Sequence, residues 1–144
     1  SRKSVQSYLG RVSGPLLDRL DMHIEVPAVK YDELSSGSGG EASKEIRKRV
    51  TAARALQSER FAGTGCRCNA AMSSELTEKH CRLTADAEKF MRSAFESLSL
   101  SARAYGRIIK VARTIADLAA SETIELVHIS EAVRYRSLDR KYWQ

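Results

Sequence analysis

The stretch that most constrains the fold is residues 101–120, SARAYGRIIKVARTIADLAA. Its apolar residues recur at steps of three and four, which predicts one face of a long helix. Basic residues recur at the same steps on a neighbouring face. The apolar face must pack against other elements, and the basic face must be solvated or meet an anion. The apolar positions are Ala102, Tyr105, Ile108, Ile109, Ala112, Ile115, Ala116 and Ala119, and the basic ones are Arg103, Arg107 and Lys110.

Helix start and stop signals divide the sequence around this stretch. Acidic residues open a helix over 41–61, and Gly63 and Gly65 end it. Ser73 or Ser74, Thr84 and Ser101 are favourable N-caps for a short helix to residue 81, a helix over 85–98 and the long helix. Residues 122–129 are predicted to form an extended connector, and Ser130 to cap a last helix over 131–137. The sequence predicts a mainly α fold, a small bundle of four to five helices.

The first forty residues differ in character. Met22, Ile24 and Val26 alternate with polar residues and stop at Pro27, which predicts a half-buried strand. The chain contains no second convincing strand to pair with it. Ser and Gly dominate residues 35–40, which are typical of a flexible linker. We therefore expect a mobile arm with one orphan strand over 1–27, a linker over 28–40, and a helical domain over 41–144.

Composition limits the partners and the compartment. The 144 residues carry a net charge of +6, which is compatible with a nucleic-acid or phosphate partner without requiring one. No apolar run reaches the roughly 18 residues of a membrane span, and there is no signal-peptide pattern. The three cysteines favour a reducing cytosol over a disulfide framework. We expect a cytoplasmic protein with no membrane partner, cut from a longer chain because the first residue is not Met.

Several separate segments, in the right order, resemble a known family. They are RVSGPLLDRLDMHIEVP at 11–27, RVTAARALQSERF at 49–61, Asn69-Ala70, LSARAYGRIIKVARTIADL at 100–118 and HISEAVRYRSLDRKYW at 128–143. Together they resemble the C-terminal part of a magnesium-chelatase-like AAA+ ATPase of the ComM (YifB) group. The resemblance covers nearly the whole chain apart from the Gly/Ser linker. It implies that residues 1–27 are the remnant of the AAA+ core, with its last strand, and that residues 41–144 are the helical lid domain.

The resemblance also implies roles for two arginines. Arg19 matches the arginine finger that reaches into the neighbouring subunit's nucleotide site, and Arg103 matches the sensor-2 arginine. Rigid guanidinium groups suit both roles, because negative charge develops on the phosphate during transfer. The sequence lacks a G-x-x-x-x-G-K-[ST] loop and the paired acids that hold Mg²⁺. ATP and Mg²⁺ are therefore expected cofactors of the full-length protein only, and this chain should not hydrolyse ATP alone.

The resemblance implies a lid that closes over ATP, senses its phosphate and couples the subunits of a hexameric ring for DNA remodelling or branch migration. The isolated chain is expected to be monomeric. Two alternatives stay open: a stand-alone helical nucleic-acid-binding module, and the lid of a metal-chelatase subunit. The first alternative would use the basic residues of the helix over 41–61, which are Arg47, Lys48, Arg49, Arg54 and Arg60.

Each candidate residue also has a purely structural interpretation. Arg103 would be solvated or paired with Asp86 or Glu88, and Arg19 would pair with Asp18 or Asp21. Arg107 and Lys110 are expected to be solvated. A Cys₃His set could in principle hold zinc, but its spacing is poor, so buried thiols are the commoner explanation and no metal site is predicted. The four residues of that set are Cys66, Cys68, His80 and Cys81.

Overall fold

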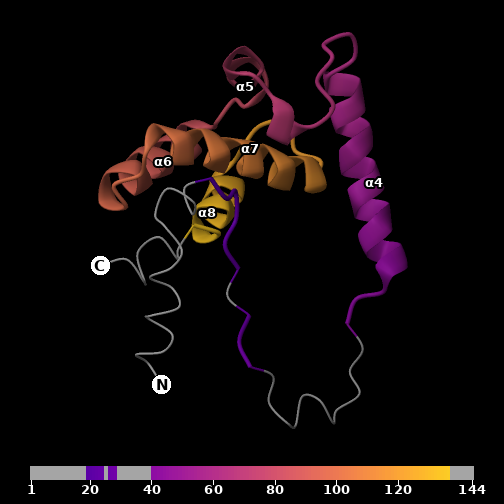
Figure 1. The fold of residues 1–144 in the computed structure, drawn as a ribbon, viewed down its shortest axis with the longest axis horizontal. Helices are drawn as coiled ribbons and strands as arrows, with labels where there is room; N and C mark the ends of the chain where they lie inside the picture. The colour runs from indigo at the N-terminus through magenta and orange to yellow at the C-terminus, as the bar shows by residue number, and fades with distance from the viewer. Residues whose placement is uncertain (1–18, 25, 29–39, 137–144) are drawn as a thin grey trace.

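The computed structural model describes residues 19–24, 26–28 and 40–136 (Figure 1). These residues form five α-helices and one short 3₁₀ helix, and no strand, so the predicted mainly helical class is confirmed. Residues 29–39 of the predicted linker lie outside the described part, and the division into three domains stays a prediction. The helices are α4 (Ser43–Arg60), η1 (Asn69–Ala71), α5 (Ser74–His80), α6 (Ala85–Ser97), α7 (Ala102–Leu118) and α8 (Leu126–Arg134).

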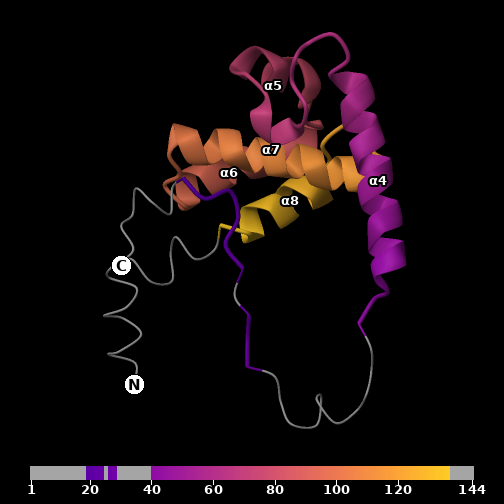
Figure 2. The same ribbon diagram turned by 45° about the vertical axis from the view of Figure 1, so that its right-hand side comes forward.

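Helix α7 is the centre of the bundle. It contacts α8, α4 and η1, while α6 packs mainly on α8. In both views α4 stands across one end of α7 (Figures 1 and 2). The predicted apolar face of α7 is buried in its middle part, at Ile108, Ile109, Ala112 and Ala116, whereas Ala102, Tyr105 and Ala119 are exposed. Each fully buried Ile or Met side chain contributes about 1.5–3 kcal/mol to stability. Deeply buried apolar residues of the core include Ala87, Met91, Ile108, Ala112, Ala116, Ile124 and Ile129.

Three predicted N-caps are confirmed. The hydroxyl oxygen of Ser73 accepts from the amide of Leu76 at 3.2 Å. Thr84 and Ser101 accept in the same way from the amides three residues later, at 3.4 Å and 3.1 Å. Each such cap satisfies a donor that the helix itself leaves unpaired and contributes about 1 kcal/mol. The starts of α5, α6 and α7 are therefore set by local sequence.

The predicted start of the last helix is wrong. Helix α8 begins at Leu126, with Glu125 as N-cap, so the second half of the predicted connector is helical. The backbone amide of Glu125 donates to Nδ1 of His128 at 3.0 Å, and the Glu125 side chain accepts in return from the His128 backbone. Ser130 lies inside the helix, where its hydroxyl donates to the Val127 carbonyl. Burial of Ile129, Ala132 and Val133 at helical spacing outweighs the extended character of the local sequence.

The predicted orphan strand is also not formed in the described residues. Residues 22–24 and 26–28 have no regular secondary structure. The backbone amide of His23 donates instead to the carbonyl oxygen of Tyr135, at 2.7 Å, just past the end of α8. A strand needs a ladder partner for its main-chain groups, and this arm finds its partner at a helix end. We refer to residues 19–24 as the arm.

None of the described helices is long and apolar enough to cross a membrane.

Candidate functional site

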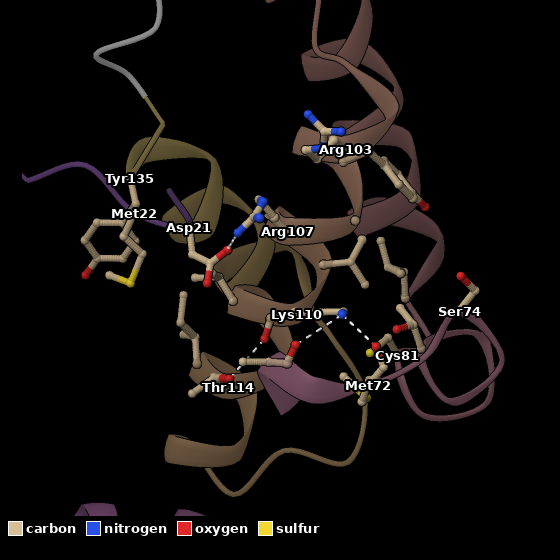
Figure 3. A pocket seen from close by; sticks show the side chains of 18 of the residues that line it. Asp21, Met22, Met72, Ser74, Cys81, Arg103, Arg107, Lys110, Thr114 and Tyr135 are labelled. Atoms are coloured by element: carbon tan, nitrogen blue, oxygen red, sulfur yellow. Dashed lines mark hydrogen bonds and ion pairs between the residues drawn. The ribbon is translucent and has the colours of Figure 1, made fainter. Parts of the chain in front are cut away.

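An open groove of about 960 Å³ runs along α7, with lining residues from Ala102 to Leu118 (Figure 3). Figure 3 shows Arg103 and Arg107 on α7, with Asp21 and Met22 of the arm and Tyr135 lying to one side. The opposite side is lined by Met72, Ser74 and Cys81, close to η1 and α5. The basic face of α7 therefore forms part of the groove wall.

Arg103 lies in the first turn of α7, two residues after the Ser101 cap, and its side chain is exposed. It lines the groove. The first turn of a helix carries free backbone N–H groups and a partial positive charge, so an anion is favoured there. The structure thus places Arg103 where a phosphate could reach it, and its sensor role stays a prediction.

Arg107 is not a solvated residue, contrary to expectation. Its guanidinium pairs with the carboxylate of Asp21 in the arm, and the Arg107 side chain is 29% exposed. Asp21 was one of the two acids that the sequence offered as partners for Arg19. The pair joins residues 86 positions apart, which no local pattern could indicate.

Lys110 was also expected to be solvated, but it makes contacts within the protein. Its ammonium group donates to the carbonyl of Met72 at 2.7 Å and to that of Ala70 at 3.3 Å. Both carbonyls lie at the end of η1, where helical carbonyls lack partners within the helix. Lys110 therefore ties α7 to the 3₁₀ helix.

Arg19 is exposed and stands at the start of the arm, two residues before Asp21. It does not line the groove. An arginine finger acts on another subunit, so exposure away from the chain's own groove is compatible with that role. The finger assignment stays a prediction.

A buried polar cluster at the other end of α7 was not predicted from the sequence. We call it the Asp117 cluster: Asp117, Arg60, Asn69 and Arg113. Nη1 of Arg60 donates to Asp117 at 2.8 Å and to Oδ1 of Asn69 at 2.9 Å. Nδ2 of Asn69 donates to Asp117 at 2.7 Å, and Nε of Arg113 does so at 3.1 Å. The cluster fastens α4 and η1 to α7, and the four-residue spacing of Arg113 and Asp117 was its one local signal.

The charged groups of this cluster shift one another's pKa values. Burial alone would raise the pKa of Asp117, but the hydrogen bonds from Arg60 and Asn69 and the two guanidinium charges outweigh it and lower the pKa. The hydrogen bond to Asp117 raises the pKa of Arg60, whereas burial lowers the pKa of Arg113. The carboxylate is thus held ionised between two cations.

These contacts reduce the basic set proposed for nucleic-acid binding. Arg60 is committed to the Asp117 cluster, and Arg49 pairs with Glu41. Arg47, Lys48 and Arg54 are exposed on α4. Solvated residues on one helix face are the ordinary interpretation of such a set, because no aromatic side chain is interleaved to stack bases.

The four residues considered for zinc make contacts within the protein or are buried in its core. Sγ of Cys66 donates to the carbonyl of Cys68 at 3.3 Å, and the ring of His80 packs edge-on against Phe61 at 5.9 Å. Cys81 is buried in the core. Within the part of the chain that the structure describes, no three His, Cys, Asp or Glu side chains are grouped so that they could hold a metal ion.

Cys81 should resist alkylation in the folded protein. Burial raises its pKa to about 11, so at pH 8 its thiolate fraction is about a hundredfold or more below that of a free cysteine of pKa near 8.5. Cys66 and Cys68 are only half-buried and should be modified first. Iodoacetamide labelling with peptide mass spectrometry measures the order, and labelling in urea should remove it. Equal labelling of all three thiols in the native protein would contradict the buried position of Cys81.

Comparison with known proteins gives two family matches. Residues 40–136 match the family described as magnesium chelatase, subunit ChlI C-terminal, and residues 1–34 match the family described as magnesium chelatase, subunit ChlI. The first match covers the whole of the described bundle. The groove and the Asp117 cluster therefore lie within the matched region.

Curated relatives agree with these matches. Competence protein ComM of Haemophilus influenzae is 42% identical over 141 residues, which are 97% of this chain and 27% of ComM. The uncharacterized protein YifB of Salmonella typhimurium is 40% identical over 92% of this chain and 26% of its own length. The uncharacterized protein Rv2897c of Mycobacterium tuberculosis is 33% identical over 90% and 25%. This chain spans about a quarter of the length of these relatives. By sequence and by the extent of the match, the chain belongs to the magnesium chelatase ChlI C-terminal family.

Proposed function

We propose that the helical bundle is the lid of a chelatase-related AAA+ ATPase, and that it closes over ATP so that Arg103 binds the terminal phosphate. The observation that carries the proposal is the position of Arg103. Its side chain is exposed on the groove, in the first turn of the central helix of the bundle. It is also the residue that matches the sensor-2 arginine in the family resemblance.

The electrostatics of this face suit a phosphate. Arg103, Arg107 and Lys110 lie on one side of α7 and line the groove, whose lining also contains the carboxylates of Asp21, Glu78 and Glu131, with Asp21 paired to Arg107. The partial positive charge of the helix N-terminus adds to the three cations. A guanidinium group offers two parallel N–H donors to a phosphate, which a lysine cannot match.

Gly106 supports a close approach to the same face. It lies inside α7 between Arg103 and Arg107, where glycine costs up to about 1 kcal/mol relative to alanine. A Cβ added there would meet no described atom within 4 Å, so packing among the described residues does not call for glycine. A nucleotide or another domain that approaches α7 closely would account for it.

The remaining parts of the proposed machine come from outside this chain. This chain covers about a quarter of the length of its relatives. In the full-length protein, a P-loop would hold the phosphates of ATP, and paired acids would hold Mg²⁺. Arg19 would reach the site of the next subunit in a hexameric ring. ATP-driven work on DNA is proposed from the resemblance to the ComM group. A metal-inserting chelatase subunit would use the same lid chemistry, so the test of Arg103 does not depend on the substrate.

Arg103→Ala in the full-length protein should reduce the rate of ATP hydrolysis by about 10- to 100-fold, because it removes a charged hydrogen bond to phosphate worth about 1.5–3 kcal/mol. Arg103→Lys should recover part of the rate, since it restores charge without the bidentate geometry. Steady-state phosphate release measures both.

Arg92→Ala is the matched control. Arg92 is an exposed arginine of α6 whose partner is Glu88, outside the groove. The Arg92→Ala protein should hydrolyse ATP at the wild-type rate. An Arg103→Ala protein with wild-type hydrolysis would overturn the proposed function.

A further inference from the structure

Three contacts fasten the arm to the helical bundle. The carboxylate of Asp21 pairs with the guanidinium of Arg107 on α7. Nη1 of Arg136 donates to the carbonyl of Leu20 at 2.6 Å, and the amide of His23 donates to the carbonyl of Tyr135 at 2.7 Å. The arm is therefore held against both α7 and the end of α8.

Burial agrees with a seated arm. His23 is only 7% exposed, although the arm contains no helix or strand. Its neighbours Met22 and Ile24 stay exposed, so the arm inserts one residue and leaves the rest on the surface. The seat is specific, because each fastening contact uses a particular backbone group or carboxylate.

The ion pair of the arm stands next to both candidate arginines. Arg107 follows Arg103 by four residues on α7, so the two lie on one face, one helical turn apart. Asp21 follows Arg19 by two residues in the arm. Figure 3 shows Arg107 between Arg103 and Asp21 in the groove.

We infer that the Asp21–Arg107 pair links the phosphate-binding end of α7 to the arm, so that closure of the lid on one subunit's ATP sets the position of Arg19 for the neighbouring subunit. This inference rests on the proposed function. Arg103 and Arg107 belong to one continuous helix and must move together. A movement of α7 that brings Arg103 to phosphate therefore pulls on Asp21, and the arm carries Arg19 with it.

The strength of the pair suits an adjustable link. Asp21 is 50% exposed and Arg107 is 29% exposed. A pair this exposed shifts an equilibrium by about two- to fivefold, not by orders of magnitude. The main-chain hydrogen bonds at Leu20 and His23 hold the arm near the bundle, and the ion pair biases its position relative to α7.

Hydrogen exchange of the 144-residue chain tests the link without ATP. In Asp21→Ala, the exchange rate of the His23 amide should rise about two- to fivefold, while amides in the middle of α7 keep their protection. The charge-reversed protein, which combines Asp21→Arg with Arg107→Asp, should return the rate toward wild type. Glu41→Ala is the control, because it breaks another exposed arginine pair, on α4.

ATP hydrolysis by the full-length protein tests the coupling. Asp21→Ala should lower kcat about two- to fivefold and reduce the Hill coefficient for ATP, with KM nearly unchanged. Faster exchange at His23 with unchanged kcat and Hill coefficient would overturn the inference, as would unchanged exchange. Normal hydrolysis by Arg103→Ala would instead overturn the proposed function, whatever the exchange data show.

Discussion

Replacing Asp117 by alanine is expected to lower the free energy of unfolding by about 3–5 kcal/mol, because it leaves two arginines buried without their counter-ion. The side chain of Arg113 is 1% exposed and that of Arg60 is 15% exposed. Arg113 therefore has almost no contact with water, and Arg60 has little. Urea unfolding followed by circular dichroism measures the loss, since the described fold is mainly helical.

Two variants separate the charge from the packing. Asp117→Asn keeps the size of the side chain and a hydrogen bond, so its loss should be smaller than that of the alanine variant. Glu88→Ala breaks the exposed pair with Arg92 and should cost at most about 1 kcal/mol. A loss below about 1 kcal/mol in Asp117→Ala would show that the cluster does not hold α4 in place.

The stabilisation by Asp117 should depend on pH in a definite direction. The pKa of Asp117 is lowered in the folded protein, chiefly by its hydrogen bonds and arginine neighbours, which outweigh burial. Its stabilising contribution is therefore complete above the unfolded value of about 3.9 and is lost as pH falls through the lowered folded value. The difference in stability between wild type and Asp117→Asn should be constant near neutral pH and shrink in that acidic range.

Mixing two variants of the full-length protein tests the proposed ring, because the recovered activity shows which subunit each arginine serves. In the full-length protein, Arg19→Ala alone should reduce hydrolysis by about 10³-fold or more, as expected for loss of an arginine finger. The Arg103→Ala protein alone should also hydrolyse ATP more slowly than the wild type. Equal mixing of the two variants should restore activity at about a quarter of the sites, because a site is competent when its own subunit keeps Arg103 and the neighbour keeps Arg19.

The control for mixing places both changes in one chain. A protein with Arg19→Ala and Arg103→Ala, mixed with Arg103→Ala protein, leaves no site with an intact Arg103 and should gain nothing. Recovery only in the first mixture supports an arginine that acts in trans. If the first mixture also stays inactive, both arginines serve the same subunit and the proposed role of Arg19 is wrong.

The helical elements were largely predictable because their signals are local. Ser73, Thr84 and Ser101 cap helices as expected, and the periodicity of residues 101–120 identifies the helix that organises the core. The start of α8 was missed because Glu125 caps it with help from His128, a pairing that the usual cap residues do not suggest. The strand at 22–26 was wrong because its alternation lacks the partner that a sheet requires.

The site was only partly predictable. Residue type and helical position placed Arg103 on an exposed face at the start of α7. The fates of Arg107 and Lys110 depend on partners 86 and 38 residues away, and that of Arg60 on one 57 residues away. Tertiary folding decides such contacts, and a cationic stripe looks the same in sequence whether its members are solvated or paired.

The attachment of α7 at its far end makes the helix a lever. Asp117, held by α4 and η1, lies fourteen positions from Arg103 on the same helix, which corresponds to about 21 Å. A tilt of about 10° around that fulcrum displaces Arg103 by about 4 Å, which is more than the length of a hydrogen bond. A small movement at Asp117 is thus magnified at Arg103. Mutations in the Asp117 cluster that spare the fold should therefore still be felt at the opposite end, as lost precision in reaching an anion.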